Sequence, residues 1–182
     1  MSGPGTLDWQ PALDHPELVA APVAEALSGL GATSDLRALV APIDAELADT
    51  VEFCAAYGVH LAESANCVVV EGRRGDVTRL AAIMILATDR ADVNKTVRKH
   101  LDVRKMSFAS METATSLTGM EYGGITPIGL PADWPILVDR GVVDAGLVVI
   151  GSGIRGSKIA LDGAALAALP NAEVLDLALP SA

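Results

Sequence analysis

The stretch LVVIGSGIRGSKIAL, residues 147–161, decides between two folds for this chain of 182 residues. Gly151, Gly153 and Gly156 spell G-x-G-x-x-G directly after an apolar run, and Asp176 lies 20 residues beyond Gly156. As a pattern this is the fingerprint of a dinucleotide-binding βαβ unit, whose glycines admit a pyrophosphate and whose acid binds a ribose. The alternative is a glycine loop between two strands.

The residues after the glycines favour the second alternative. A dinucleotide fold places its fingerprint in the first βα turn, with more strands after it, but only 26 residues follow Gly156. The next segment, SKIALDG, carries β-branched Ile159 early and Gly163 in the place of a helix interior, and the alternation of Ile159 with Leu161 is typical of a strand. The sequence therefore predicts a strand–loop–strand connection and no nucleotide cofactor.

Outside this stretch, the apolar pattern predicts strands in neighbouring runs with helices inserted unevenly between them, which is typical of a mixed α+β fold. The helices are expected at 16–31, 44–58, 88–101 and 110–119, the 44–58 helix with Leu47, Val51, Cys54 and Ala55 inward. The main strands are expected at 36–43, 67–70, 80–87, 105–109, 135–139, 146–151, 157–161 and 173–177, with a hairpin turn at Gly72–Gly75. We expect residues 1–35 to form a loose arm (1–15) and a helix, and residues 36–182 a single domain.

Charge is distributed unevenly along the chain. The net charge of −10 argues against a generic nucleic-acid binder. However, residues 73–105 carry nine basic and four acidic side chains, whereas residues 1–72 carry one and eleven, and residues 106–182 carry three and eight. This central island of charge +5 is either a solvated helix face with a hairpin tip or a landing site for a polyanion.

Several classes of protein are disfavoured. The longest strongly apolar run, Leu80–Ala87, is far shorter than the roughly 20 residues of a membrane helix, and no signal peptide is visible. Cys54 and Cys67 stand alone, as expected for reduced thiols of a cytoplasmic protein. The three histidines are scattered, without the spacing of a metal site. The sequence predicts a cytoplasmic protein with no metal and no membrane contact.

A second glycine cluster lies in LTGMEYGGITPIGLP, residues 117–131. Gly123, Gly124 and Gly129 alternate with Pro127 and Pro131 in a segment without helical or strand periodicity. Such a loop bends backbone amides and carbonyls into a binding wall, because glycine permits close approach and positive φ. The alternative is a tight connection between a helix and an edge strand.

With these motifs in order, the chain resembles the YbaK/prolyl-tRNA synthetase-associated domain family. Residues 117–131 are similar to the stretch with that family's G-x-x-x-P loop, here Gly123 to Pro127, and residues 147–161 resemble its later strand, glycine-arginine loop and strand. NCVVVEG (66–72) and ADVNKTVRKHLDVRKMSFAS (91–110) follow the expected order. The resemblance covers residues 36–176.

The resemblance implies a free-standing editing domain with a mixed, partly barrel-like sheet, surrounding helices and a small pocket. Such hydrolases cleave the ester between a wrong amino acid, such as Ala or Cys, and the terminal ribose of a tRNA, typically the one for proline. They use no cofactor: backbone groups orient the ester, and a bound water and the ribose hydroxyl take part. The implied partner is the aminoacylated 3′ end of tRNA, and a synthetase partner is left open.

The family motifs give the expected site residues. Those implied in catalysis are Gly123, Gly124, Thr126, Pro127 and Asn66. Those implied in substrate binding are Ser152, Gly153, Arg155 and Lys158. The basic island supplies expected tRNA contacts at Arg73, Arg74, Lys95, Arg98 and Lys99.

Several alternatives stay open at these positions. Thr126 and Ser152 bind the amino acid or water, or bond their own turns. Arg155 holds a phosphate or pairs with an acid such as Asp139.

One departure from the family pattern bears on activity. Family deacylases commonly have a lysine where Asn66 stands, and an amide brings no positive charge. Lys158 stands where an acidic or polar residue is expected, so one hypothesis is that Lys158 projects into the pocket and supplies the missing cation. The alternative is an exposed strand residue. Two other functions follow if the cation is lost: a catalytically silent tRNA-binding module, or a small-ligand-binding protein of the same fold.

Overall fold

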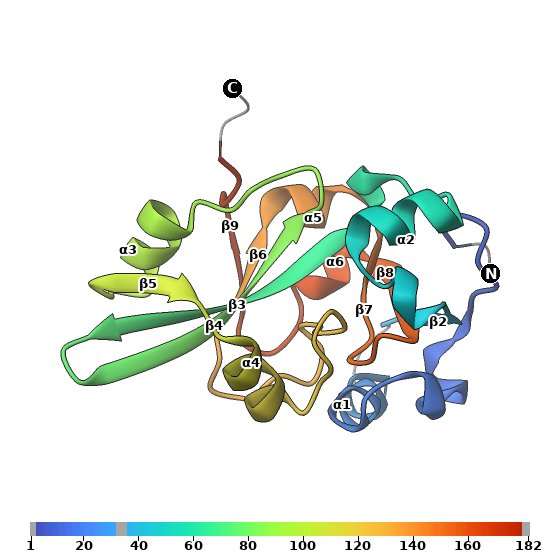
Figure 1. The fold of residues 1–182 in the computed structure, drawn as a ribbon, viewed down its shortest axis with the longest axis horizontal. Coiled ribbons are helices and arrows are strands. Elements are labelled where there is room, and N and C mark those ends of the chain that lie inside the picture. Colours follow the sequence, from blue (N-terminus) through green and yellow to red (C-terminus); the bar gives the residue numbers. More distant parts are fainter. Residues whose placement is uncertain (1–2, 32–35, 180–182) are drawn as a thin grey trace.

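The computed structural model describes residues 3–31 and 36–179, which fold around two β-sheets (Figure 1). The four-stranded sheet has the order β1-β2-β8-β7, and the five-stranded sheet has the order β5-β3-β4-β6-β9. The strands are β1 (Gln10–Pro11), β2 (Leu39–Pro42), β3 (Ala65–Arg74), β4 (Val77–Leu86), β5 (Lys105–Phe108), β6 (Ile136–Asp139), β7 (Leu147–Gly151), β8 (Ser157–Asp162) and β9 (Ala172–Leu175).

Short helices surround the two sheets. The α-helices are α1 (Ala21–Gly31), α2 (Thr50–Tyr57), α3 (Arg98–His100), α4 (Met111–Thr118), α5 (Arg140–Asp144) and α6 (Gly163–Leu166). The 3-10 turns are η1 (Ala12–Asp14), η2 (Pro16–Leu18), η3 (Ala45–Leu47) and η4 (Leu61–Glu63), and η5 (Val93–Val97) is π-helical.

The stretch 147–161 forms two antiparallel strands, β7 and β8, in which Ile150 pairs with Ile159. A dinucleotide fingerprint needs a helix after its glycines, and here a strand follows. The strand–loop–strand prediction is therefore confirmed.

The β3–β4 hairpin is longer than predicted. Its register pairs Arg74 with Val77, which leaves Gly75 and Asp76 as a two-residue turn, with Gly75 at φ +61°. Only the half of the hairpin that lies over the core has the apolar residues from which strands are predicted, so the predicted strands ended before the real ones. The exposed polar half extends as one end of the elongated molecule (Figure 1).

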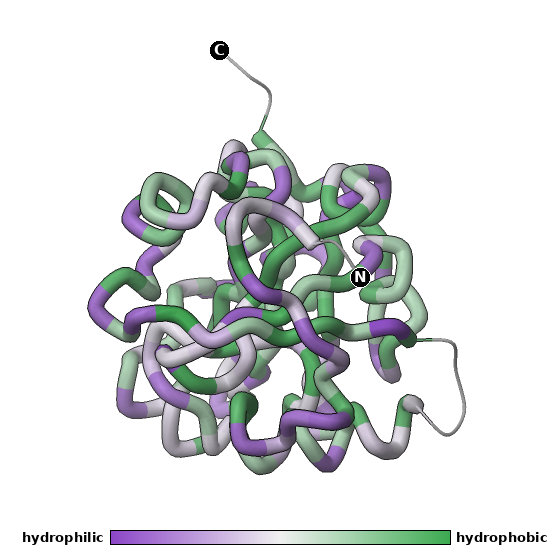
Figure 2. The backbone as a smooth tube through the Cα atoms, turned by 90° about the vertical axis from the view of Figure 1, so that its right-hand side faces the viewer, coloured by the Kyte–Doolittle hydropathy of each residue, from purple (hydrophilic) through white to green (hydrophobic). Residues whose placement is uncertain are grey.

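The two sheets share one core. A bridge between Ser64 and Val149 links β3's entrance to β7. The largest apolar cluster combines residues of the five-stranded sheet, such as Met84, with residues of the four-stranded sheet, such as Ile159. In Figure 2, segments of hydrophobic residues accordingly run through the middle of the molecule. The mixed α+β fold in one domain is confirmed, and the described sheets do not close into a barrel.

The helix expected at 44–58 is broken, which corrects its inward face. Asp44 caps η3 by accepting from the Glu46 N–H, and the chain is extended again at Asp49 (ψ 142°) before α2 begins. This break resets the helical phase. Phe53 and Cys54 are buried, whereas Val51 is 66% exposed.

Residues 3–15 are packed, in contrast to the loose arm expected there. Trp9 is buried and its indole N–H donates to the Pro4 carbonyl at 2.9 Å, while β1 pairs with β2. The Gly and Pro content predicted looseness, but one buried tryptophan anchors the segment. The expected boundary at residue 35 lies outside the described residues, and the division of the chain there stays a prediction.

The helix expected at 88–101 is shorter than predicted. Asp92 caps η5 by accepting from the N–H groups of Lys95 and Thr96, while its own N–H donates to the Leu177 carbonyl. That bond to the C-terminal segment holds residues 88–91 out of the helix. Val97 and Leu101 are buried.

Candidate active site

A cavity of about 360 Å³ lies between the two sheets. Its wall comes from β3 (65–69), the end of β7 (149–151), Lys158 of β8 and residues 48–50 at the start of α2. Tyr122, Gly123 and Ile125, together with residues at the β5–α4 junction, complete it, whereas Gly124 is buried behind the lining. Both glycine clusters and the strand of Asn66 therefore meet at one place.

The two glycine loops hold each other behind this wall. The Gly153 N–H donates to the Gly124 carbonyl at 2.7 Å, and the Glu121 N–H donates to the Gly153 carbonyl at 2.8 Å. A Cβ on Gly124 would lie 2.6 Å from the Ile154 carbonyl, and one on Gly151 would overlap the Gly124 carbonyl. Only glycine permits this approach of the two backbones.

The backbone of Gly123 lines the cavity in a conformation that requires glycine. Its φ is +84°, and a Cβ there would overlap the Arg155 guanidinium. The N–H groups of Gly123 and Ile125, both in the cavity wall, donate to no described residue. Two residues of the cavity wall thus have backbone donors without a described partner.

Arg155 fastens this loop to the start of α2. Its Nη1 lies 3.3 Å from Asp49 Oδ1 and 3.3 Å from the Tyr122 carbonyl, and its Nε donates to the Ala45 carbonyl at 3.2 Å. The acid that pairs with Arg155 is therefore Asp49. Asp139, suggested from the sequence, is buried and accepts from the backbone of Leu177 instead.

Lys158 is buried and lines the cavity. Its Nζ donates to the Ala48 carbonyl at 2.8 Å and lies 5.1 Å from the centre of the Phe53 ring. Burial lowers the pKa of Lys158 to about 8, helped by the positive charge of Arg155 and opposed by Asp49. The alternative of an exposed strand residue is therefore wrong.

Asn66 lines the same cavity as Lys158. Its Oδ1 accepts from the Thr50 hydroxyl at 2.7 Å, which fixes the amide and leaves its N–H₂ group without a partner among the described residues. A neutral donor and a cation thus face one space from different strands.

Other predicted site residues lie behind the wall. Thr126 and Pro127 are buried outside the lining, and Thr126 Oγ1 is the one buried side-chain oxygen or nitrogen without a hydrogen-bond partner in the described part of the chain. The buried Ser152 hydroxyl bonds its own turn, at 3.1 Å from the Ser157 carbonyl. Gly153, at φ +89°, packs against Val23 of α1. Their assigned roles stay predictions.

The described lining has no reactive thiolate. Cys67 faces the cavity, but burial raises the pKa of its thiol to about 12, so that it stays protonated at neutral pH. Burial also raises the pKa of Cys54. No group of three metal-ligating side chains occurs among the described residues, and no helix there is long and apolar enough to cross a membrane. What this site offers a ligand is fixed dipoles, the Lys158 ammonium and the carboxylate of Asp49, which is paired with Arg155.

Sequence reasoning missed most of the cavity rim. Phe108 is 68% exposed and Met111 is 56% exposed, and both line the mouth together with Tyr122. Phe108 falls in the predicted strand 105–109. The available signal was the rarity of aromatic residues, six in the whole chain.

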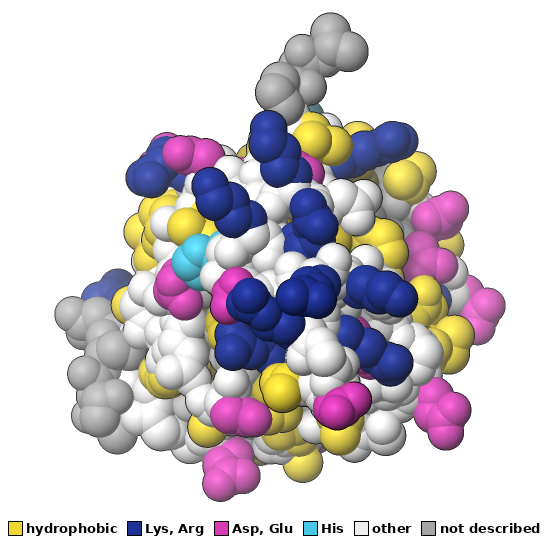
Figure 3. Space-filling model, turned by 90° about the vertical axis from the view of Figure 1, so that its left-hand side faces the viewer, with side chains coloured by type: hydrophobic (Ala, Val, Ile, Leu, Met, Phe, Trp, Pro, Cys, Tyr) yellow, Lys and Arg dark blue, Asp and Glu magenta, His cyan; other side chains and the backbone are white. Residues whose placement is uncertain are grey.

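The basic residues expected to contact tRNA gather away from the cavity, on the end of the molecule that carries the hairpin and α3 (Figure 3). All five of them are exposed: Arg73, Arg74, Lys95, Arg98 and Lys99. Arg74 pairs with Asp102.

Comparison with known proteins follows this geometry. The family model described as aminoacyl-tRNA editing domain matches residues 44–169. A crystal structure of a candidate trans-editing enzyme for prolyl-tRNA synthetase superimposes with a TM-score of 0.72 at 23% identity, covering 87% of this chain and 96% of that one. A hypothetical protein superimposes with a TM-score of 0.72 at 22% identity, covering 87% of this chain and 99% of the other. These likenesses show the fold.

Proposed function

The chain belongs to the family of aminoacyl-tRNA editing domains, and from this premise we propose that it hydrolyses the ester of a mischarged aminoacyl-tRNA. The observation that supports this most is the cavity in which two unpaired backbone N–H groups, Asn66 and the Lys158 ammonium come together. The proposal places the reaction in the cytoplasm, with tRNA as partner.

The chemistry is that of positioned water. Water attacks the ester carbonyl, the bond between that carbon and the ribose oxygen breaks, and the ribose oxygen leaves with a proton. Negative charge develops on the carbonyl oxygen in between. That charge would be stabilised by the N–H groups of Gly123 and Ile125 and by the ammonium of Lys158. Stabilisation of developing charge by fixed groups of this kind is usually the largest single contribution to catalysis.

The proposed substrate is the tRNA for proline bearing a small amino acid, Ala or Cys. The lining includes small and aliphatic side chains, such as Ala65, Val149 and Ile150. A cavity of this kind selects by volume, at about 1–3 kcal/mol per methylene. The similar crystal structure described as a candidate trans-editing enzyme for prolyl-tRNA synthetase supports this choice.

The test is deacylation of alanyl- and cysteinyl-tRNA specific for proline. We expect the parent to hydrolyse at least one. Gly123→Ala keeps its N–H, but a Cβ at φ +84° that overlaps Arg155 should move this donor out of position, and activity should fall about 100-fold, as when an oxyanion donor is lost. The fold should survive, since the group displaced is the end of the flexible Arg155 side chain. Gly146→Ala is the matched control, because Gly146 has φ +76° with open space around it and lies outside the cavity lining. Equal activity in Gly123→Ala would refute the role of the loop.

A second candidate, a silent tRNA-binding module, is favoured by Asn66. If the parent binds tRNA without hydrolysing any charged form, Asn66→Lys should create turnover. Loss of turnover in Lys158→Met from an active parent would instead support Lys158 as the pocket cation.

A further inference from the structure

Three hollows follow one another along the outer edge of β5. The active-site cavity shares Phe108 with a second hollow of about 330 Å³, which in turn shares Met106 and Ser107 with a third of about 620 Å³. Among the described strands β5 pairs with β3 alone, so its other edge has backbone N–H and C=O groups outside the ladder. An unbroken path leads from the cavity to the hairpin end.

Aromatic side chains stand at the cavity end of this path. Phe108 and Tyr122 are 68% and 55% exposed and both line the cavity. The other four aromatic residues are buried or half-buried: Trp9, Phe53, Tyr57 and Trp134. An exposed aromatic ring is a platform on which unpaired bases stack.

Basic side chains stand at the opposite end. Arg73, Arg98, Arg104 and Lys105 line the third hollow, with Glu71 as the acid among its lining residues. Glu71 pairs with Arg73 at 2.7 Å, whereas the side chains of Arg104 and Lys105 bond to no described residue. Figure 3 shows Lys and Arg side chains gathered on this end of the molecule. In a chain of net charge −10, such a cluster suits phosphate groups.

We propose that this path, the β5 track from Phe108 to Lys105, holds the single-stranded 3′ end of tRNA. The terminal nucleotide enters the cavity, a preceding base stacks on Phe108, and the phosphates that follow lie at Arg104 and Lys105. Three residue steps of β5 span about 10 Å, the length of about three stacked nucleotides. The inference rests on the proposed function and adds to it the route of the substrate.

Binding of uncharged RNA tests the aromatic end without requiring catalysis. The probes are a fluorescent acceptor-stem hairpin ending in single-stranded ACCA and the same hairpin with a blunt end. The parent should bind the ACCA probe more tightly. Phe108→Ala should weaken that binding about tenfold, the usual scale of one base–aromatic stack, and leave the blunt probe unchanged. Phe108→Tyr should retain the affinity, whereas Phe108→Leu should not.

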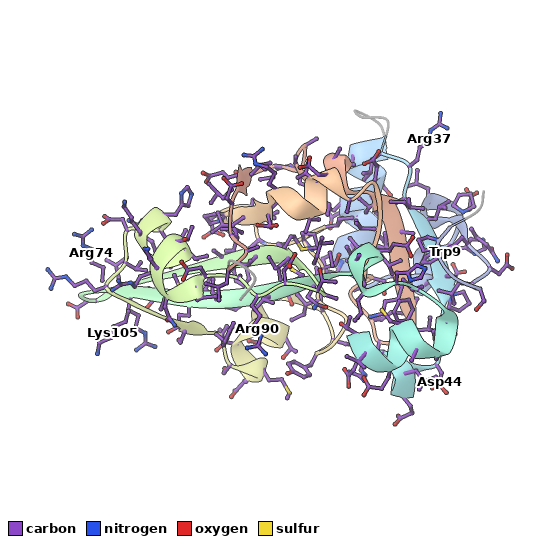
Figure 4. The ribbon with its side chains drawn as sticks, turned by 90° about the horizontal axis from the view of Figure 1, so that it is seen from above. Trp9, Arg37, Asp44, Arg74, Arg90 and Lys105 are labelled. Atoms are coloured by element: carbon purple, nitrogen blue, oxygen red, sulfur yellow. The ribbon has the colours of Figure 1, made fainter. Side chains whose placement is uncertain are left out.

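Salt dependence tests the basic end. Replacing Arg104 and Lys105 together by Gln should make the slope of log affinity against log salt shallower by about 1.5, since each phosphate contact contributes about 0.7–0.9. Arg37→Gln is the matched control, because Arg37 is exposed at the opposite end of the molecule from Lys105 (Figure 4). Its slope should equal that of the parent.

The outcomes separate the track from the enzyme. Equal binding of both probes by the parent, or unchanged affinity in Phe108→Ala and unchanged slope in the double variant, would overturn the track even if the parent deacylates tRNA. The predicted binding pattern without any hydrolysis would uphold the track and refute the deacylase. Because Phe108 is largely exposed, its variants should unfold at the same denaturant midpoint as the parent. That measurement is the control against misfolding.

Discussion

Lys158 is the one lysine of four that the fold buries. Removing an ammonium from water disfavours its charged form. The Ala48 carbonyl and the Phe53 ring offset part of that cost, and the pKa still falls to about 8 from an ordinary 10.5. The folded protein therefore holds this proton less tightly than the unfolded chain does.

Stability should consequently depend on pH at this residue. Between pH 8 and 10.5 the unfolded chain binds more protons at Lys158 than the folded one, so the free energy of unfolding rises with pH across that window. The rise should reach about 3 kcal/mol relative to Lys158→Met, which cannot titrate there. Urea unfolding of both proteins at pH 7 and pH 10 measures it, and an identical pH dependence in the two would contradict it.

At the scale of the element, α4 is defined at both ends by its own residues. The Ser110 hydroxyl accepts from the Thr113 N–H at 3.0 Å, and Gly119, at φ +66°, donates to the Thr115 carbonyl. The helix follows β5 directly and carries Met111 into the cavity rim. The capped N-terminus of α4 therefore both stabilises the helix and positions a residue of the cavity rim.

Removal of this cap should be measurable. Ser110→Ala is expected to lower the free energy of unfolding by about 1 kcal/mol, because the Thr113 N–H loses its acceptor. The control is Ser116→Ala within the same helix, where an exposed serine gives way to the best helix former and stability should hold or rise slightly. Equal losses in the two variants would show that the cap contributes nothing specific.

At the scale of the whole molecule, the two tryptophans report on different parts. Trp9 packs with β2, β8 and α2 through residues such as Leu39 and Phe53, and Trp134 packs against Val69 of β3. A third apolar cluster combines residues of both sheets. A fold with one shared core is expected to unfold in one step.

Single-tryptophan variants test this cooperativity. In Trp9→Phe and in Trp134→Phe, the fluorescence midpoint of the remaining tryptophan in urea should coincide with the far-UV circular dichroism midpoint of the same variant. An earlier fluorescence transition of Trp9, in Trp134→Phe, would instead show that the part of the fold packed around Trp9 unfolds as a separate unit.

Local sequence signals determined a large part of this fold. The alternation around Ile159, the cap at Ser110 and the glycine at residue 119 act on their own neighbours along the chain, so β7, β8 and α4 could be predicted. The glycine clusters likewise marked the places where backbones approach closely. The predicted inward face of the 44–58 helix was wrong, because the chain is extended at Asp49 between η3 and α2 and this break resets the helical phase.

The candidate site depended on tertiary structure. Arg155 meets Asp49 across 106 positions of sequence, and the buried amine of Lys158 reaches the carbonyl of Ala48 across 110. Burial and charge at such contacts arise from residues brought together only by the folded sheets, and these set the pKa of Lys158. The sequence by itself therefore determined which residue types the site draws on, and the packing of the two sheets decided which of them face the cavity.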